Sequence, residues 1–293
     1  MSSRLKVDKP KTLIYFGAHP DDETFGMGAT LAQYAIYGVK VFYVCSTGGE
    51  EGTVAPQFMK GYTTVKQLRQ AELKNAAREL GLAGVVYLGY RDSGMRGSES
   101  NKLPDALAMA PLEEVVGRMV KIIRELKPDV VITHDAGGGY GHPDHVATHD
   151  ATVQGFCAAG DPAQYPAAGP AFQPRKLYFS VRSRGLSKIM VRLMPLFGKD
   201  PRHFGRNEDI DLTRMASVQY PVHAVISLSK QAIKIRNKAA ACHASQGGGQ
   251  HRPGPFRIVQ VIEKLRGPKD YFMREYPAPS VQRRERDLFD GIE

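Results

Sequence analysis

The sequence predicts an α/β fold, in which a Rossmann-like, mostly parallel sheet is flanked by helices and followed by a less regular C-terminal part. Short apolar runs alternate with longer helical segments through the first half of the chain. Strands that alternate with helices in this way favour parallel pairing, with helices on both faces of the sheet. We expect one domain over residues 1–293, with its core at about 12–160 and a C-terminal part containing a lid at about 175–280.

Four buried strands are expected in the first half because each run is short, apolar and rich in β-branched or aromatic residues. They are residues 12–18, 39–46, 85–89 and 129–133. Between them we expect helices at 23–37, 64–80 and 111–126. Gly38 and Gly81 are placed to end the first two helices, Thr64 and Gln67 form a capping box, and Pro111 suits a first turn. The remaining segments, 47–63 and 90–110, have the composition of long loops.

The second half is less regular. We expect a loop at 161–174, a strand at 177–181, an insertion or lid at 182–215, a strand at 222–227, a helix at 230–243 capped by Ser229, a flexible loop at 247–255 and a last strand at 271–276.

Composition restricts the classes of protein that the chain can represent. The apolar fraction of 42% and charged fraction of 24% are ordinary for a soluble globular protein. No apolar run approaches the roughly 18 residues of a membrane span, and the polar start lacks the apolar core of a secretory signal. Cys45, Cys157 and Cys242 are odd in number, widely spaced and without a CxxC partner. They argue for buried thiols and a cytoplasmic location.

The formal charge of +10 permits an anionic partner, such as a phosphorylated substrate, a nucleic acid or an acidic membrane surface. The most visible basic cluster is residues 283–286, but acidic residues interrupt most such runs. No signature of a nucleic-acid-binding module is present, so we favour a solvated basic surface over nucleic-acid binding.

Histidines and aspartates follow two of the predicted strands directly. Residues 18–23 read AHPDDE after the first strand, and residues 140–145 read YGHPDH after the fourth. Open α/β sheets gather their functional groups at such strand exits. The two stretches together hold enough histidine and carboxylate ligands for a catalytic zinc with an open position.

The spacing within these stretches suggests how the ligands divide. His19 and Asp22 lie three residues apart, so a turn can point both at one ion, and His145 supplies a third ligand. Two histidines, one carboxylate and a water are typical of catalytic rather than structural zinc. Zinc lowers the pKa of such a water to about 7. Asp21 then points elsewhere and is the candidate general base.

His142 and Asp144 complete the second stretch. His142 is a candidate for stabilising an oxyanion or protonating a leaving amine, and Asp144 for fixing the tautomer of a histidine. A less specific interpretation is that Asp21 or Asp22 caps the following helix. The histidines at 149, 203, 223 and 251 are interpreted as turn residues.

These residues resemble the LmbE/PIG-L family of zinc-dependent deacetylases of N-acetylglucosaminyl compounds. The similarity covers residues 12–150 well and extends more loosely to 230–246; it rests on HPDDE at 19–23 with GATL at 28–31, and on HPDH at 142–145. The resemblance implies that His19, Asp22 and His145 bind zinc. Iron(II) could occupy the same ligands, so the sequence leaves the native metal open. The resemblance also implies Asp21 as base, His142 as acid and oxyanion stabiliser, and Asp144 as the residue that tunes His142.

Further matches concern the substrate. Arg69 and Glu72 occupy the positions of a substrate-contacting arginine and a nearby glutamate, with an exposed ion pair as the alternative. Asp92 matches an aspartate that contacts sugar hydroxyls, and is otherwise a turn residue. Tyr140 matches a mobile tyrosine near the oxyanion, or is simply an aromatic residue in a glycine-rich loop. His243 to Gln246 resembles a late family motif.

The resulting hypothesis is hydrolysis of the N-acetyl group of a glucosamine-type sugar conjugate, with release of acetate. Residues 25–27 depart from the thiol-pathway branch of the family, so the exact substrate stays open. Alternatives are a metal-dependent hydrolase of another bond, such as a thiol-conjugate amidase or a phosphoesterase, and a non-catalytic protein that binds an anionic partner. Members of this family often self-associate, so the resemblance also leaves a homo-oligomer open.

Overall fold

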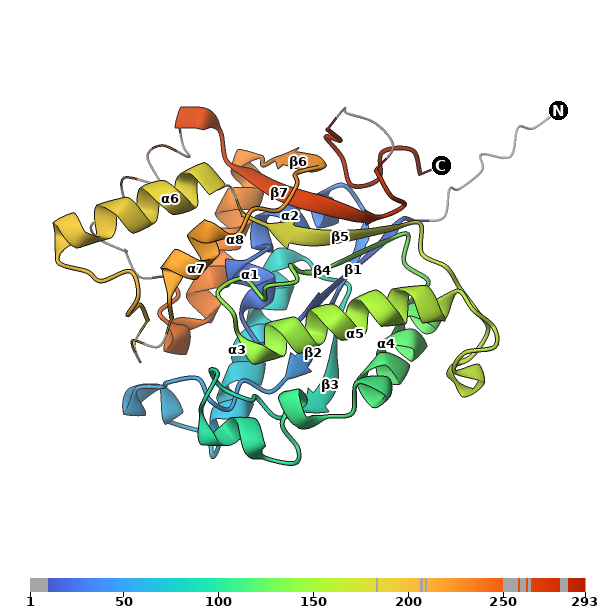
Figure 1. Cartoon of the computed structure of the whole chain (residues 1–293), viewed down its shortest axis with the longest axis horizontal. Helices are drawn as coiled ribbons and strands as arrows, with labels where there is room; N and C mark the ends of the chain where they lie inside the picture. The colour runs from blue at the N-terminus through green and yellow to red at the C-terminus, as the bar shows by residue number, and fades with distance from the viewer. Residues whose placement is uncertain are drawn as a thin grey trace.

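The strands in the described part of the chain form one seven-stranded sheet (Figure 1). The computed structural model describes residues 10–182, 184–205, 208, 210–249, 258, 262, 265–279 and 284–292. The strands are β1 (Thr12–Gly17), β2 (Lys40–Thr47), β3 (Gly84–Tyr90), β4 (Val130–His134), β5 (Lys176–Val181), β6 (Ala224–Ser227) and β7 (Lys269–Tyr276). All seven overlap strands predicted from the sequence.

The strand order is β3-β2-β1-β4-β5-β7-β6. Strands β1 to β5 pair in parallel, whereas β7 is antiparallel to both β5 and β6. This confirms the predicted class of a mostly parallel α/β sheet. The chain order reverses between β1 and β4, which is the position where open sheets of this kind leave a crevice at the carboxyl ends of their strands.

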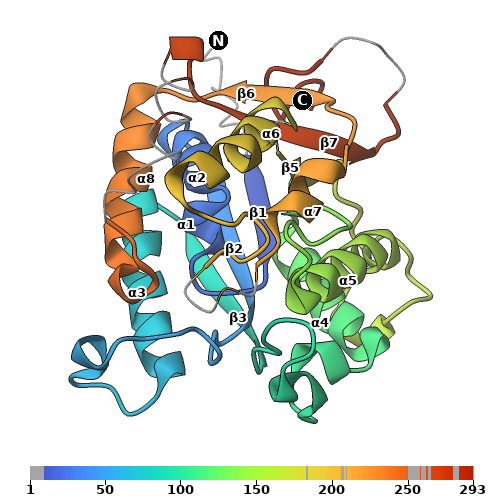
Figure 2. The same cartoon turned by 60° about the vertical axis from the view of Figure 1, so that its left-hand side comes forward.

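Helices cover both faces of the sheet (Figure 2). The face covered by the first helices carries α1 (Asp22–Phe25), α2 (Gly28–Ile36), α3 (Val65–Leu80) and α8 (Lys230–Cys242), and the opposite face carries α4 (Leu112–Leu126) and α5 (Pro143–Ala159). Short 3-10 turns lie in the loops at Pro56–Met59, Glu99–Lys102, Leu107–Met109, Pro166–Ala168, Met194–Phe197 and Ala244–Gln246.

Alternating residues of β1 serve two separate cores. Ile14 and Phe16 pack in the cluster that includes α4 and α5, whereas Leu13 and Tyr15 pack in the cluster that includes α2. All are buried, because successive side chains point to opposite faces and both faces are covered. This explains why β1 reads as a continuous apolar run.

The predicted helix at 23–37 is wrong as a single element, because the structure has two helices there. The four-residue α1 ends at Gly26, and α2 begins at Gly28. A Cβ on Gly28 would lie 2.7 Å from Cγ of Arg236, so α2 approaches α8 closely at this point. Met27, which lies between α1 and α2, is only 1% exposed.

The helix ends predicted at Thr64, Gly81 and Ser229 are confirmed. The side chain of Thr64 accepts a hydrogen bond from the Gln67 amide, and Gly81 closes α3 in the left-handed conformation. Ser229 caps α8 in the same way as Thr64 caps α3, through the Ala232 amide. The predicted capping box forms only in part, because the Gln67 side chain accepts from the Thr63 amide and not from that of Thr64. At α4 the helix starts one residue later than expected, with Pro111 in the capping position.

Arg124, near the end of α4, hydrogen-bonds to the end of α5 and to the loop that follows it. Its guanidinium, 2% exposed, donates to six backbone carbonyl oxygens. The acceptors are Ala158, Ala159, Asp161, Gln164, Tyr165 and Gly169. The loop predicted at 161–174 therefore has a fixed path although it contains little regular structure.

The segment interpreted as an insertion or lid, 182–215, contains helices α6 (Arg184–Leu193) and α7 (from Leu212 to Ser217). The predicted flexible loop at 247–255 is described only to residue 249, so Pro253, Pro255 and His251 lie outside the described residues. Among the described residues, no helix combines the length and apolar character that a membrane span requires.

Candidate metal centre and active site

The histidines and aspartates singled out in the sequence meet at the carboxyl ends of the central strands. His19 to Asp22 follow β1, Asp92 follows β3, and His142 to His145 begin α5 after the loop that leaves β4. The sets after β1 and β4 flank the point where the strand order reverses, and Asp92 reaches His19 there from the end of β3. The site is formed by the three segments that follow the carboxyl ends of β1, β3 and β4.

The turn after β1 is fixed by the carboxylate of Asp22. Its Oδ2 accepts hydrogen bonds from the backbone amides of Ala18 and His19, each at 2.9 Å. The Tyr43 hydroxyl donates to the His19 carbonyl at 2.6 Å. The bonds from Ala18 and His19 hold Oδ2 in the turn, and Oδ1 faces His145. Asp21 occupies the N-cap position of α1, but its side chain makes no capping hydrogen bond, and the Asp22 carboxylate bonds to the turn before the helix.

Three side chains form a triangle suited to one cation. His19 Nδ1 lies 3.2 Å from His145 Nε2 and 3.7 Å from Asp22 Oδ2, while His145 Nε2 lies 3.5 Å from Asp22 Oδ1. Ligands at about 2.0–2.1 Å from a tetrahedral zinc lie about 3.3 Å from one another. The triangle therefore fits a zinc-sized ion, and two imidazoles with one carboxylate are the donor set of catalytic sites.

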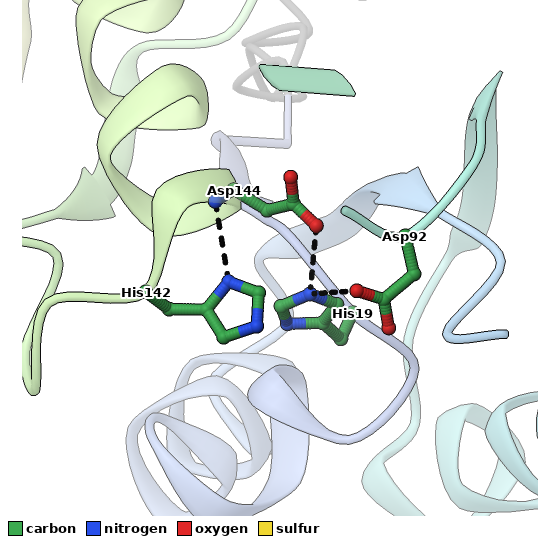
Figure 3. Close-up of side chains that lie close together, drawn as sticks. All are labelled: His19, Asp92, His142 and Asp144. Atoms are coloured by element: carbon green, nitrogen blue, oxygen red, sulfur yellow. Dashed lines mark hydrogen bonds and ion pairs between the residues drawn. The ribbon is translucent and has the colours of Figure 1, made fainter. Parts of the chain in front are cut away.

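A second group of residues orients His19 from its other side (Figure 3). Asp144 Oδ2 lies 3.2 Å from His19 Nε2 and also accepts the Ser93 amide at 2.9 Å, and Asp92 Oδ1 lies 3.5 Å from the same ring nitrogen. A carboxylate at Nε2 favours the tautomer with the proton there, which leaves the Nδ1 lone pair for a metal.

This placement corrects the contact expected for Asp144. Its carboxylate faces His19, and only its backbone amide reaches His142, donating to Nδ1 at 3.2 Å. His142 thus caps α5 and, as an acceptor at Nδ1, carries its proton on Nε2 when neutral. Burial, reinforced by the nearby charge of His19, lowers the pKa of His142 to about 3. The ring is a hydrogen-bond donor without being a cation.

The surroundings favour positive charge at the centre of the site. Burial alone would lower the pKa of His19, but the carboxylates of Asp92 and Asp144 raise it well above its usual value. His145 has the opposite balance: burial and the repulsion of His134 hold its pKa well below the usual value. Carboxylates beside His19 and a neutral His145 together form an environment that a bound cation would satisfy.

His134 belongs to this site although sequence reasoning missed it. It is the last residue of β4 and is 8% exposed, and its ring stacks on His145. Its Nε2 lies 3.5 Å from Asp22 Oδ2 and has no hydrogen-bond partner in the described part of the chain. Its position directly at a strand exit was the available signal. His149, interpreted as a turn residue, instead lies buried on α5 with Nδ1 2.8 Å from the His134 carbonyl oxygen.

Asp21 lies beside the triangle and is paired with Arg69. Arg69 Nη2 lies 2.7 Å from Asp21 Oδ2 and donates to the Pro20 carbonyl, while Nη1 donates to Gly49. Burial raises the pKa of Asp21 to about 6 against the opposing charge of Arg69. A carboxyl group with such a pKa can take up a proton near neutral pH.

The interpretation of Arg69 and Glu72 as an exposed ion pair is wrong. Both are buried, and they make separate contacts. Glu72 accepts hydrogen bonds from the amide and hydroxyl of Ser245, at 2.8 and 2.7 Å. Asp92 is also buried, against His19. Tyr140 is half-buried, with its ring 5.3 Å from that of His145 and 6.0 Å from that of His142.

Known proteins with similar sequences identify the family to which a site of this kind belongs. The family profile described as "PIG-L: GlcNAc-PI de-N-acetylase" matches residues 14–156. A 1D-myo-inositol 2-acetamido-2-deoxy-alpha-D-glucopyranoside deacetylase of Geodermatophilus obscurus is 36% identical over 96% of this chain and 98% of its own length. All the residues placed in the triangle fall within the matched segment.

Solved structures show the same fold at lower identity. An N,N'-diacetylchitobiose deacetylase from Pyrococcus horikoshii superposes with a TM-score of 0.61 at 20% identity, over 90% of this chain and 83% of that one. A 4-carboxy-2-hydroxymuconate hydratase from Pseudomonas putida has a TM-score of 0.58 at 14% identity, over 93% and 99%. The fold therefore occurs with more than one reaction.

The assignment consequently rests on sequence identity and not on the fold. Identity of 36% along nearly the whole of both chains is far more than a shared architecture provides. The chain belongs to the PIG-L family of de-N-acetylases.

Proposed function

We propose that this protein is a zinc-dependent hydrolase that removes the N-acetyl group from an N-acetylglucosamine-type conjugate and releases acetate. The observation that carries the proposal is the triangle of His19, Asp22 and His145 with the carboxylate of Asp21 beside it. The curated relative, named as a deacetylase of an N-acetylglucosaminyl inositol, supports this substrate class. Inositol is accordingly the aglycone to test first.

His19, Asp22 and His145 would hold the metal. Zinc bound in such a site supplies a Lewis acid for the amide carbonyl and brings the pKa of a water to about 7. Asp21 is proposed to accept a proton from the attacking water, as a carboxylate with a pKa of about 6 is suited to do at neutral pH. Iron(II) could occupy the same ligands.

His142 is proposed to act through its Nε2 proton. Because Nδ1 accepts the Asp144 amide, Nε2 is the donor, and it can hydrogen-bond to the oxygen on which negative charge develops. As the C–N bond breaks, His142 is proposed to donate its Nε2 proton to the departing nitrogen, and the proton that Asp21 took from the water returns the ring to its neutral form. The products are then acetate and a free amine. Asp144 would act by orienting His19 rather than His142.

The remaining proposed roles concern the sugar. Arg69, Asp92 and Glu72 are proposed to contact the substrate. Their partners in the structure support further roles: Arg69 orients Asp21, and Glu72 binds the segment at Ser245. Tyr140 is proposed to close over the oxyanion. Burial raises its pKa, so it would act as a neutral hydrogen-bond donor.

The first experiment pairs elemental analysis with acetate release from N-acetylglucosaminyl inositol and from N-acetylglucosamine. Wild type is expected to contain one metal per chain and to release acetate, and His145→Ala to lose both. His203→Ala, which changes an exposed histidine between α6 and α7, is the matched control and should match wild type. Carefully prepared protein without metal would overturn the proposal.

The same assay separates the alternatives. A thiol-conjugate amidase would retain metal and cleave a different amide, while a binding protein would return its ligand unchanged. We also propose a reducing cytoplasmic location, which the three free cysteines support.

A further inference from the structure

The backbone of Asp21 has a conformation that residues with a Cβ rarely adopt. Its φ is 144° and its ψ is −21°, and it is one of the few non-glycine residues with positive φ in the described part of the chain. Such a conformation persists only where the surroundings impose it. Here it separates two adjacent carboxylates: Asp21 turns to Arg69, and Asp22 turns to the histidines.

Glu23 binds the backbone of this residue. Its Oε2 accepts the Asp21 amide proton at 2.9 Å, while the Asp21 carbonyl accepts the amides of Thr24 and Phe25 at 2.9 and 2.8 Å. Both sides of the unusual peptide are therefore held. The side chain of Glu23 is fully buried, so water does not compete with its carboxylate for the hydrogen bond from the Asp21 amide.

His243 holds Glu23 in turn. His243 Nε2 lies 2.7 Å from Glu23 Oε1, and both side chains have 0% exposure. The Thr24 hydroxyl also donates to Oε1, and His243 is the partner that comes from outside the turn. A buried carboxylate that loses such a partner turns away or takes up a proton. His243 follows the last residue of α8, so it comes from a part of the chain remote from the turn after β1.

The same short segment reaches Asp21 by a second route. Two residues after His243, Ser245 donates from its amide and its hydroxyl to Glu72 on α3. Arg69, one turn earlier on α3, holds the Asp21 carboxylate. The backbone and the carboxylate of Asp21 are therefore both tied to residues 243–245, through different helices.

We propose that Glu23 and His243 are positioning residues for the base: His243 holds Glu23, and Glu23 holds the Asp21 backbone in the conformation that points its carboxylate beside the metal triangle. The inference rests on the proposed role of Asp21 and deepens it. Neither residue touches the reacting atoms. The competing explanation is an ordinary buried ion pair that contributes stability alone.

Kinetics distinguish these explanations. His243→Leu removes the donor at similar volume, whereas His243→Gln keeps an N–H that can reach Glu23. We expect His243→Leu and Glu23→Ala to lower kcat about 10- to 100-fold, because a base displaced by about 1 Å loses that much. KM and the metal content should stay within twofold of wild type, and His243→Gln should recover kcat to within about threefold.

A matched control is available at the C-terminal end. Glu285 forms a mostly buried ion pair with Lys176 and Arg274, remote from the triangle. Glu285→Ala should lower the urea midpoint of unfolding and leave kcat unchanged. If His243→Leu behaves in the same way, with lower stability and wild-type kcat, the positioning role is overturned.

A second measurement needs no turnover. Asp21→Gly and Asp21→Ala both remove the carboxylate, but only the alanine variant is strained at positive φ. With Glu23 present, we expect the glycine variant to have the higher urea midpoint, against the usual advantage of alanine. In the Glu23→Ala background the backbone is free to relax, and the order should reverse.

The same order in both backgrounds, or a more stable alanine variant with Glu23 present, would overturn the inference. This comparison also separates the two proposals. If wild type releases no acetate, the proposed function fails, and the order of the glycine and alanine variants still decides whether Glu23 holds Asp21.

Discussion

The ring of His134 stacks on that of His145, with 4.0 Å between centroids and 11° between planes. The same ring directs Nε2 toward Asp22 Oδ2 at 3.5 Å. One side chain at the end of β4 thus contacts two of the three proposed metal ligands. It can restrict the rotation of His145 and hydrogen-bond to the carboxylate of Asp22.

We therefore expect His134→Ala to weaken metal binding about 10- to 100-fold, the effect that residues behind metal ligands usually have. His134→Phe keeps the stacked ring and loses the nitrogen. It should show an intermediate affinity if both contacts contribute. Affinity is measured by competition with a chromophoric chelator, with His203→Ala as control. Wild-type affinity in both His134 variants would contradict this role.

Asp21→Asn is expected to retain one metal per chain and to lose about 10²- to 10⁴-fold in kcat, because the amide keeps the shape of the carboxylate without its basicity. Metal content and acetate release are measured on the same preparation. Near wild-type turnover would remove Asp21 from the mechanism.

The charge of Arg69 predicts a change in the pH profile. The base must be ionised, so kcat/KM should fall as pH drops through the pKa of Asp21, which burial places at about 6. Arg69 favours the ionised form, and its removal raises that pKa. In Arg69→Met the acid limb should move to higher pH by about one unit. A cation bound nearby would shift the acid limbs of wild type and of Arg69→Met to lower pH together, so the direction of the difference between them stays the same.

The measurement is kcat/KM against pH for wild type and Arg69→Met, with Lys66→Met as a control that removes a half-exposed cation from the same helix. A limb that stays in place, or moves to lower pH, would show that the limb reports another group.

Arg124→Met should destabilise the protein by about 2–4 kcal/mol, because several buried carbonyl oxygens lose a charged donor at once. Arg124→Lys should recover only part of this, since an ammonium has three donors and cannot match the planar fork. Urea unfolding measures the difference. Metal content should be unchanged, and a loss of metal in Arg124→Met would show that this loop supports the site.

The central strands β1 and β4 could be predicted because every residue in them is buried. In β1 and β4 the apolar runs are continuous, since both faces of the sheet are covered. Caps such as Thr64 and Ser229 also lie next to the helices they start. The break between α1 and α2 was missed because it depends on Arg236, which is distant in sequence.

The site was predictable to the same extent. The spacing of His19, Asp22 and His145 at strand exits predicts that they lie together. The sequence does not predict the partner of Asp144, because both His19 and His142 are reasonable partners. Only the start of α5 in the structure shows that the carboxylate faces His19 and the backbone amide faces His142. Glu23 reads as a helix residue and His243 as a helix end, and only the packing of α8 brings them together.

The order in which the chain is synthesised gives this last contact a consequence. Every member of the metal triangle has left the ribosome once His145 has emerged, whereas His243 follows only after β5 and β6. A nascent or truncated chain could therefore acquire its cation early and still hydrolyse poorly. The protein would become an efficient catalyst only after His243 has emerged, so copies that terminate before this residue would hydrolyse the substrate poorly.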